Sequence, residues 1–163
     1  VFNILGPLTN PAMAKRQLLG VYDAALLVPM AQVLASLGST RCLIVHGDDG
    51  LDELTTTTAS QVCELRAGQV ASYAITPADT GLPTASLDDL RVGSAEESAA
   101  AIRAVFGGEQ GPHRDIVVLN AGAALMVADK AEDLAAGIRL AGEAIDSGAA
   151  AATLDKLVAV SNG

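Results

Sequence analysis

The feature that most constrains the fold is an apolar run in "RCLIVHG", where Cys42, Leu43, Ile44 and Val45 follow one another without a polar side chain. A strand with one solvent face would alternate apolar and polar residues. A continuous apolar run is typical of parallel sheets whose two faces are both covered by helices. We therefore predict a buried strand over residues 41–46 within an α/β domain, followed by a loop over residues 50–58.

A second strand and a helix are predicted before this run. "QLLGVY", residues 17–22, has the composition of a short buried strand. Asp23 can cap a helix over residues 24–37, whose apolar side chains fall on one face and which Gly38 would end. Pro29 lies beyond the first turn of this helix and should distort it.

The middle of the chain has hairpin and helix signals. The pattern of residues 61–66 and 70–75, joined at residues 67–69, predicts an antiparallel hairpin. A surface segment over residues 79–92 should contain one short helix at residues 86–90. "SAEE" then places a serine cap three residues before a glutamate, which predicts a helix that runs to Phe106.

The last third of the chain completes the predicted fold. "RDIVVLN", residues 114–120, is interpreted as a third central strand, and "NAGAAL" as a turn of small residues where a helix packs closely on the sheet. Residues 131–162 should form one or two helices with a break near Ser147 and Gly148. This order predicts an α/β fold with a mostly parallel sheet flanked by helices, and no internal domain boundary.

Charge and hydrophobicity exclude several functional classes. The 163 residues are 50% hydrophobic, enough for one domain with its own core, and the net charge is −9. Nucleic-acid binding requires clustered cations, and Lys15-Arg16 is the only adjacent basic pair. The apolar run at residues 24–37 is too short to span a bilayer. We therefore expect no nucleic acid and no membrane as partners, and a cytoplasmic location.

The cysteines and histidines point to structural roles. Cys42 and Cys63 lie in strand-like runs and are expected to be small, reduced core residues. His46 and His113 could act as acid–base groups, but no carboxylate partner or nucleophile pattern accompanies either one. We expect both to be structural, with His46 as a hydrogen-bond donor at a strand end.

An acidic cluster follows the central strand. "HGDDGLDEL" brings Asp48, Asp49, Asp52 and Glu53 together where ligands bind in open α/β sheets, beyond the carboxyl ends of the strands. Adjacent Asp52 and Glu53 offer the hard oxygen ligands that Mg²⁺ prefers, and Mg²⁺ usually takes only one or two protein carboxylates. A solvated loop with capping aspartates is the alternative interpretation.

A second candidate site is the proline-containing segment "NILGPLTNP", residues 3–11. Its glycine and prolines fix the backbone and leave almost no ionisable chemistry. Such a loop can form the wall of a pocket by its shape and present a flat pyrrolidine ring to an aromatic ligand. A rigid structural turn is the more common use of the same pattern.

Five segments in order resemble the anthranilate phosphoribosyltransferase family: "VFNILGPLTNPA", "KRQLLGVYD", "VHGDDGLDEL", "RDIVVLNAGAAL" and "AIDSGAAAATLDKL". The first and third are the specific ones. The resemblance implies a fold of a small helical domain and a larger α/β glycosyltransferase domain. Residues 1–163 would be the C-terminal portion of that α/β domain, with the N-terminal helical domain and the first part of the α/β domain absent.

The resemblance also implies an activity: Mg²⁺-dependent transfer of phosphoribose from phosphoribosyl pyrophosphate (PRPP) to anthranilate in tryptophan biosynthesis, with release of pyrophosphate. The family's metal ligands correspond to Asp52 and Glu53, and its anthranilate-channel residues to Gly6 and Pro7. No catalytic residue is assigned, because the amine of anthranilate itself attacks. The full-length protein would be a homodimer.

Two alternatives remain beside this interpretation. One is an enzyme similar to pyrimidine-nucleoside phosphorylase, and the other is a non-catalytic nucleic-acid-binding relative of the fold, which the net charge of −9 disfavours. The family's glycine-rich diphosphate loop would lie before Val1. The chain by itself is therefore expected to be inactive and to bind PRPP weakly.

Overall fold

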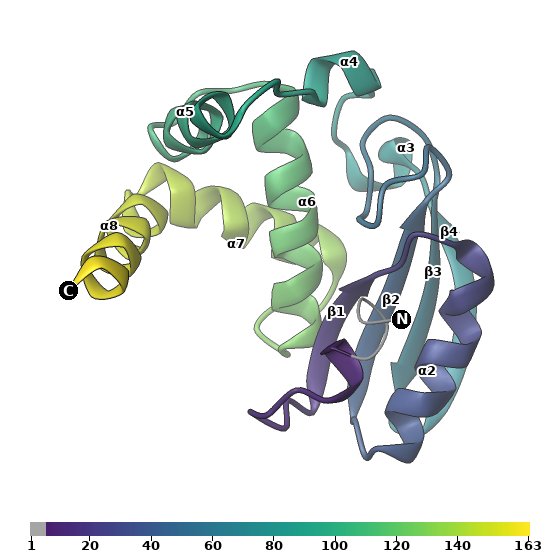
Figure 1. Cartoon of the computed structure of the whole chain (residues 1–163). Helices are drawn as coiled ribbons and strands as arrows, with labels where there is room; N and C mark the ends of the chain where they lie inside the picture. Colours follow the sequence, from purple (N-terminus) through teal and green to yellow (C-terminus); the bar gives the residue numbers. More distant parts are fainter. Residues whose placement is uncertain (1–5) are drawn as a thin grey trace.

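The computed structural model describes residues 6–163 and has an α/β architecture (Figure 1). Its sheet has the strand order β1-β2-β3-β4, formed by β1 (Arg16–Gly20), β2 (Arg41–Gly47), β3 (Ser60–Arg66) and β4 (Gln69–Ile75). Only β1 and β2 are parallel, while β2–β3 and β3–β4 are antiparallel. The predicted α/β fold is confirmed, but the sheet is mixed rather than mostly parallel.

Helices cover both faces of the sheet, as the apolar run in β2 requires. α2 (Leu27–Ser36) packs on one face, and α6 (Pro112–Val127) packs on the other (Figure 1). Alternate residues of β2 serve the two sides: Cys42 and Ile44 face α2, whereas Leu43 and Val45 face α6. The central strand is thus buried on both faces, as predicted.

The helix after β1 begins later than predicted. Asp23 accepts a hydrogen bond from the Ala25 amide (2.9 Å) and caps a short 3-10 turn, η1 (Ala24–Leu26), after which α2 starts. Pro29 therefore falls in the first turn of α2, where a backbone N–H has no partner within the helix. The predicted helix is therefore irregular at its start, where a 3-10 turn precedes α2, rather than in its interior.

The predicted hairpin is confirmed in β3 and β4. Ala67 and Gly68 form a two-residue turn in which both have positive φ, +49° and +81°. Turns of this hand match the twist of antiparallel strands. β3 is largely buried at the centre of the sheet, and β4 is the exposed edge.

The predicted third central strand was wrong. Residues 114–120 lie inside α6, a helix of 16 residues that begins with Pro112 after Gly111. The buried residues of α6 recur at helical spacing: Arg114, Val118, Leu119, Gly122, Ala123, Met126 and Val127. A short apolar run does not separate a buried strand from a buried helix, and the proline at the first helical position is the signal that favours the helix.

Of the remaining helices, α5 (Ala95–Phe106) and α8 (Ala149–Asn162) lie on the side of α6 away from the sheet (Figure 1). α5 begins at its predicted cap, since the Ser94 hydroxyl accepts from the Glu97 amide at 3.1 Å. α7 (Leu134–Asp146) and α8 are separated at Ser147 and Gly148, as predicted. Two short helices, α3 (Pro77–Thr80) and α4 (Leu87–Leu90), lie in the segment between β4 and α5.

Small residues in α6 serve both kinds of contact: Ala123 is buried against the sheet, as predicted, whereas Gly122 lies against α7. Gly122 of α6 and Gly137 of α7 meet backbone to backbone, and a Cβ on either would overlap the other helix. The "NAGAAL" segment therefore lies mid-helix, and its predicted place at a strand-to-helix turn was wrong. No helix within residues 6–163 has the length and apolar character needed to cross a membrane.

Candidate functional site

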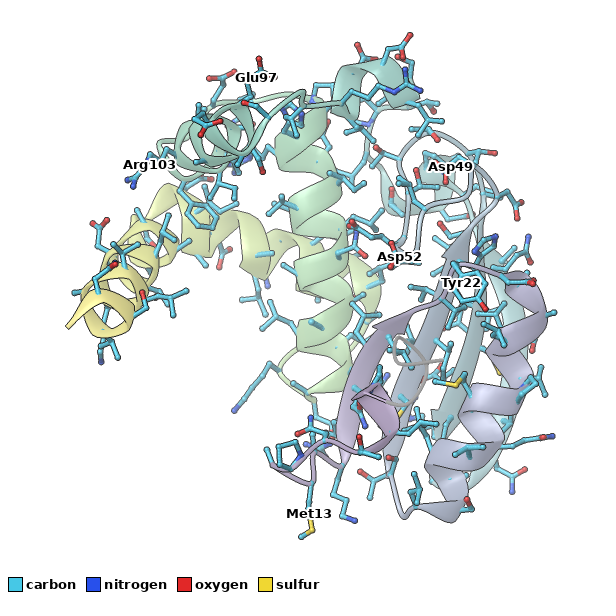
Figure 2. The ribbon with its side chains drawn as sticks, in the orientation of Figure 1. Met13, Tyr22, Asp49, Asp52, Glu97 and Arg103 are labelled. Atoms are coloured by element: carbon cyan, nitrogen blue, oxygen red, sulfur yellow. The ribbon has the colours of Figure 1, made fainter. Side chains whose placement is uncertain are left out.

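The acidic cluster lies in the loop between β2 and β3, at the carboxyl end of β2. Figure 2 shows Asp49 and Asp52 on this loop, with Asp52 on the side that faces α6. Gly20 at the end of β1 allows the loop to approach, because a Cβ there would overlap the carbonyl oxygen of Asp52. The sequence thus brings the carboxyl ends of two parallel strands and the acidic loop together.

Two of the four carboxylates have structural partners. Asp49 accepts hydrogen bonds from the hydroxyls of Thr55 (2.6 Å) and Thr57 (2.5 Å) and from the Leu51 amide (3.0 Å). Burial opposes ionisation of Asp49, but these hydrogen bonds outweigh it and lower its pKa below the ordinary value. The neighbouring Asp48 accepts from the Gln61 amide at 3.1 Å.

The other two carboxylates, Asp52 and Glu53, are unengaged. Within residues 6–163, neither side chain accepts a hydrogen bond, and neither forms an ion pair. Both are exposed. The alternative of a capping loop thus applies to Asp49, whereas Asp52 and Glu53 are left available to bind something positively charged.

Asp52 shares a pocket with Pro7. The pocket has a volume of about 440 Å³ and is also lined by Gly20 of β1, by Tyr22 in the segment after β1, and by Leu26 of η1. Pro7 belongs to a helical turn over residues 6–8, closed by a hydrogen bond from the Thr9 amide to the Gly6 carbonyl at 3.2 Å.

The two sequence-predicted sites are thus adjacent, although Pro7 and Asp52 are 45 positions apart in the chain. Gly6 is exposed and is not among the described residues that line the pocket. Residues 3–5 of the same motif lie outside the described part of the chain.

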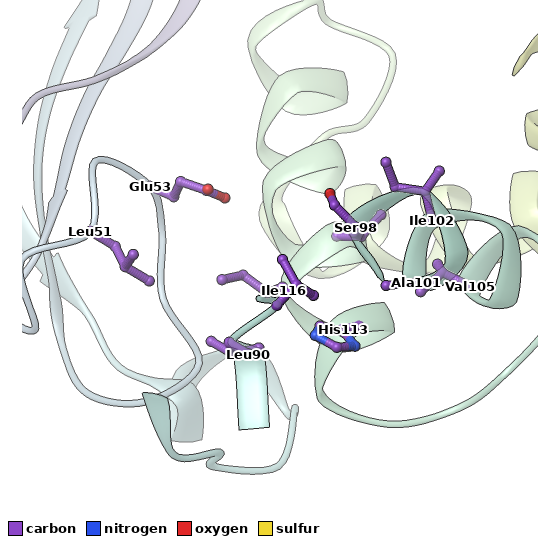
Figure 3. A pocket seen from close by; sticks show the side chains of 11 residues that line it. Leu51, Glu53, Leu90, Ser98, Ala101, Ile102, Val105, His113 and Ile116 are labelled. Atoms are coloured by element: carbon purple, nitrogen blue, oxygen red, sulfur yellow. The ribbon is translucent and has the colours of Figure 1, made fainter. Parts of the chain in front are cut away.

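Glu53 faces a different pocket. Figure 3 shows its side chain directed from the loop toward α6, across a cavity of about 320 Å³ that is also lined by His113 and Ile116. Although Glu53 remains exposed at the edge of this cavity, the partial loss of water raises its pKa, and the charges of Asp52 and Asp49 raise it further. A bound cation would reverse this repulsion.

The donor set fits a magnesium ion better than a metal held by protein alone. No group of three or more His, Cys, Asp or Glu side chains within residues 6–163 is arranged to hold a metal. Mg²⁺ is usually bound through one or two carboxylates and completes its shell with water and substrate phosphates. Asp52 and Glu53 are therefore the residues available to hold Mg²⁺.

Asn120 of α6 is a site-associated residue that the sequence analysis did not identify. Its Oδ1 accepts from the Leu54 amide (3.0 Å), and its Nδ2 donates to the carbonyls of Leu54 (2.8 Å) and Ile116 (3.1 Å). Leu54 is fully buried and directly follows Glu53. A polar residue within an apolar helical run was the available signal, but the run was interpreted as a strand.

The histidines and cysteines have the structural settings that were predicted, apart from His113. His46 Nδ1 lies 2.8 Å from the Val21 carbonyl oxygen and ties the end of β2 to the segment after β1. Cys42 and Cys63 are buried free thiols, and burial raises the pKa of Cys42. His113 lines the cavity beside Glu53, so the expectation that it is purely structural stays a prediction.

Comparison with known proteins identifies the family. The family described as "Glycosyl transferase family, a/b domain" matches residues 1–151. The chain belongs to this family.

Curated relatives of this glycosyl transferase chain are named anthranilate phosphoribosyltransferases. It is 55% identical over 163 residues to an anthranilate phosphoribosyltransferase of Parvibaculum lavamentivorans, a match that covers 100% of the chain and 48% of the relative. The chain spans about half the length of the curated relatives it matches. The resemblance to anthranilate phosphoribosyltransferases is therefore confirmed.

Solved structures agree with the fold. The crystal structure of anthranilate phosphoribosyltransferase from Thermus thermophilus superposes with a TM-score of 0.86 at 45% identity, over 97% of this chain and 46% of that one. The Saccharomyces cerevisiae enzyme in complex with PRPP and Mg gives a TM-score of 0.81 at 27% identity, over 94% of this chain and 45% of that one. The α/β fold is thus shared with enzymes of this name.

Proposed function

We propose that residues 1–163 are the C-terminal portion of the α/β domain of an anthranilate phosphoribosyltransferase. The full-length protein transfers phosphoribose from PRPP to the amine of anthranilate and releases pyrophosphate, within tryptophan biosynthesis. One observation of the structure carries the proposal: Pro7 and Asp52, from the two most specific motifs, line the same pocket. The Saccharomyces cerevisiae relative with PRPP and Mg supports the same substrate class.

In this proposal, Asp52 and Glu53 hold Mg²⁺ beside the leaving group. Their carboxylates are the two in the loop that other described residues leave unengaged, whereas Asp48 and Asp49 are held by Gln61 and by threonines. When bound, Mg²⁺ would offset the negative charge of the departing pyrophosphate. The chain supplies no nucleophile, because the nitrogen of anthranilate attacks the ribose carbon.

Gly6 and Pro7 border the path of anthranilate. Pro7 lines the pocket that Asp52 also lines, so an aromatic ligand there would lie near the metal site. Gly6 has no heavy atom within 4 Å of the position a Cβ would take, which leaves that side of the turn open. An open glycine beside a rigid proline suits a channel wall.

The subunit number and the cellular location are proposed from the same family relationship. The full-length protein is proposed to be a cytoplasmic homodimer, as expected from the family resemblance. Light scattering on the full-length protein measures the subunit number directly.

The activity test uses the full-length protein that carries residues 1–163. Loss of anthranilate fluorescence should depend on PRPP and on Mg²⁺, with pyrophosphate formed in equal amount. Phosphorolysis of a pyrimidine nucleoside without transfer to anthranilate would favour the nucleoside phosphorylase alternative and overturn the proposal. Residues 1–163 alone should show neither turnover nor tight PRPP binding by calorimetry, because backbone phosphate sites of the kind expected upstream are needed.

A further inference from the structure

The segment that carries Asp52 and Glu53 is held at both of its ends. Before it, the Leu51 amide donates to Asp49 (3.0 Å) and the Leu51 carbonyl accepts from the Gly47 amide (2.8 Å). Leu54 is held by Asn120 through both its amide and its carbonyl. Thr55 is held by Asp49 through its hydroxyl and by the Ser60 hydroxyl through its amide (2.9 Å). The attachments of Leu54 and Thr55 come from different elements. Asp49 and Ser60, which hold Thr55, belong to the loop and β3, whereas Asn120, which holds Leu54, belongs to α6.

Asn120 therefore provides a direct link between the acidic segment and the helix that covers the sheet. The side-chain amide of Asn120 pairs with both the backbone N–H and the backbone carbonyl of Leu54, whose side chain is fully buried. Buried backbone groups that lose their partners are costly, so the segment would move to recover hydrogen bonds if Asn120 were replaced by an apolar residue. Glu53 precedes Leu54 directly, and its carboxylate would move with it.

We propose that Asn120 is a positioning residue for the metal site: by clamping Leu54 from α6, it sets where the Asp52 and Glu53 carboxylates lie. This inference rests on the proposed function, since it concerns the metal that these carboxylates hold. Residues that orient metal ligands from outside the coordination shell change metal affinity by about 10- to 100-fold when they are mutated. Within residues 6–163, the Asn120 side chain has no hydrogen bond to either carboxylate, and its role is exerted through the backbone of Leu54.

The principal variant is Asn120→Leu, which keeps a similar size and removes every side-chain hydrogen bond to Leu54. Hydrogen–deuterium exchange on the full-length protein reports the clamp itself, and the amide of Leu54 should exchange at least about tenfold faster. Mn²⁺ binding followed by electron paramagnetic resonance, without substrate, reports the metal site. Its Kd should rise by about 10- to 100-fold.

Steady-state kinetics distinguish a positioning role of Asn120 from a general loss of stability. The Mg²⁺ concentration for half-maximal rate should rise in Asn120→Leu, while the KM for anthranilate stays within about twofold of the wild-type value, because Pro7 lies on another element. Ile145→Val is the matched control: it trims a buried residue of the α5–α6–α7 core and leaves Asn120 and Leu54 unaltered. It should lower the melting temperature without changing Leu54 exchange or Mn²⁺ affinity.

The outcomes distinguish this inference from the proposed function. If the wild-type protein binds Mn²⁺ and transfers phosphoribose, but Asn120→Leu changes neither Leu54 exchange nor the Kd, the positioning role is wrong. If the wild-type protein neither binds Mn²⁺ nor transfers phosphoribose, the proposed function is wrong, whatever the exchange shows. Asn120→Ala, which removes the same bonds with less bulk, provides the same readouts should the leucine variant not fold.

Discussion

The charged residues near the two ends of β2 differ: in the described part of the chain, those at its start are paired, and two of those beyond its other end are not. At its start, Arg41 is only 7% exposed and contacts Glu64 (3.3 Å), Asp129 (2.9 Å) and the Met126 carbonyl (2.6 Å). The Arg41 hydrogen bond lowers the pKa of Asp129, and the positive charge of Arg16 adds to this effect.

At the other end of β2, Asp52 and Glu53 have no cation within residues 6–163. Removal of one partner from a buried ion pair is strongly destabilising, whereas unpaired charges of one sign repel unless a ligand joins them. The first end of the strand is therefore structural, and the second is the end suited to binding a cation.

The largest effect is expected at the paired end. Arg41→Met in the full-length protein should lower the free energy of unfolding by about 3 kcal/mol, because it removes the only cation paired with the partly buried Glu64 carboxylate within residues 6–163 and one donor to the Met126 carbonyl. Denaturant unfolding followed by circular dichroism measures this change. Stability equal to wild type would show that the charges at this end are not a structural cluster.

Substitution of the unpaired carboxylates beyond the carboxyl end of β2 should change activity rather than stability. The double variant Asp52→Asn, Glu53→Gln should lower kcat at least about 100-fold and shift the Mg²⁺ requirement, because the metal would lose its protein ligands. Its melting temperature should match or exceed that of wild type, since like-charge repulsion is removed. Wild-type turnover and Mg²⁺ dependence would exclude these residues as ligands.

The proposed channel wall can be tested at Gly6, the neighbour of Pro7 in the chain. Gly6→Val should raise the KM for anthranilate by about tenfold and leave that for PRPP nearly unchanged, because the added bulk lies at the channel wall. Space for the valine Cβ exists, so the turn itself should tolerate the change. An equal rise in both KM values would point to damage of the whole loop.

The smallest effect concerns Asp49, the carboxylate that the loop itself uses. Hydrogen bonds from Thr55 and Thr57 lower its pKa, so the stability it contributes is present above the unfolded value near 3.8 and is lost as pH falls through the folded pKa. Thr57→Val should cost about 1 kcal/mol at pH 7. Unfolding measured against pH should show this difference shrinking below about pH 4, whereas a constant difference would assign the effect to packing.

Much of the first half of the fold was predictable from local pattern. The continuous apolar run of β2 indicated a strand covered on both faces, and the turn at Ala67 and Gly68 indicated the β3–β4 hairpin. The acidic segment was recognisable because it follows a buried strand directly. The sequence alone could not separate Asp52 and Glu53 from Asp48 and Asp49, since only the fold brings Gln61, Thr55 and Thr57 to the latter pair.

The errors came from the second half, where local pattern is ambiguous. Residues 114–120 have the composition of a strand, yet they lie in α6 because a helix there can bury Val118, Leu119 and their neighbours against the sheet and α7 at once. The mixed direction of the sheet has a related cause. Residues 114–120 supply no parallel strand, and the hairpin adds β3 and β4 antiparallel to one another beside β2.

The sequence by itself determined the chemistry available to this protein: hard carboxylates after a buried strand, a rigid proline turn, and motifs of one glycosyl transferase family. The tertiary structure alone decided which of these groups meet. Pro7 reaches Asp52 because β1 and β2 lie side by side, and Gly20 leaves room for the loop. Asn120 reaches Leu54, 66 residues away, because α6 packs across the sheet, and long-range contacts of this kind have no local signal in the chain.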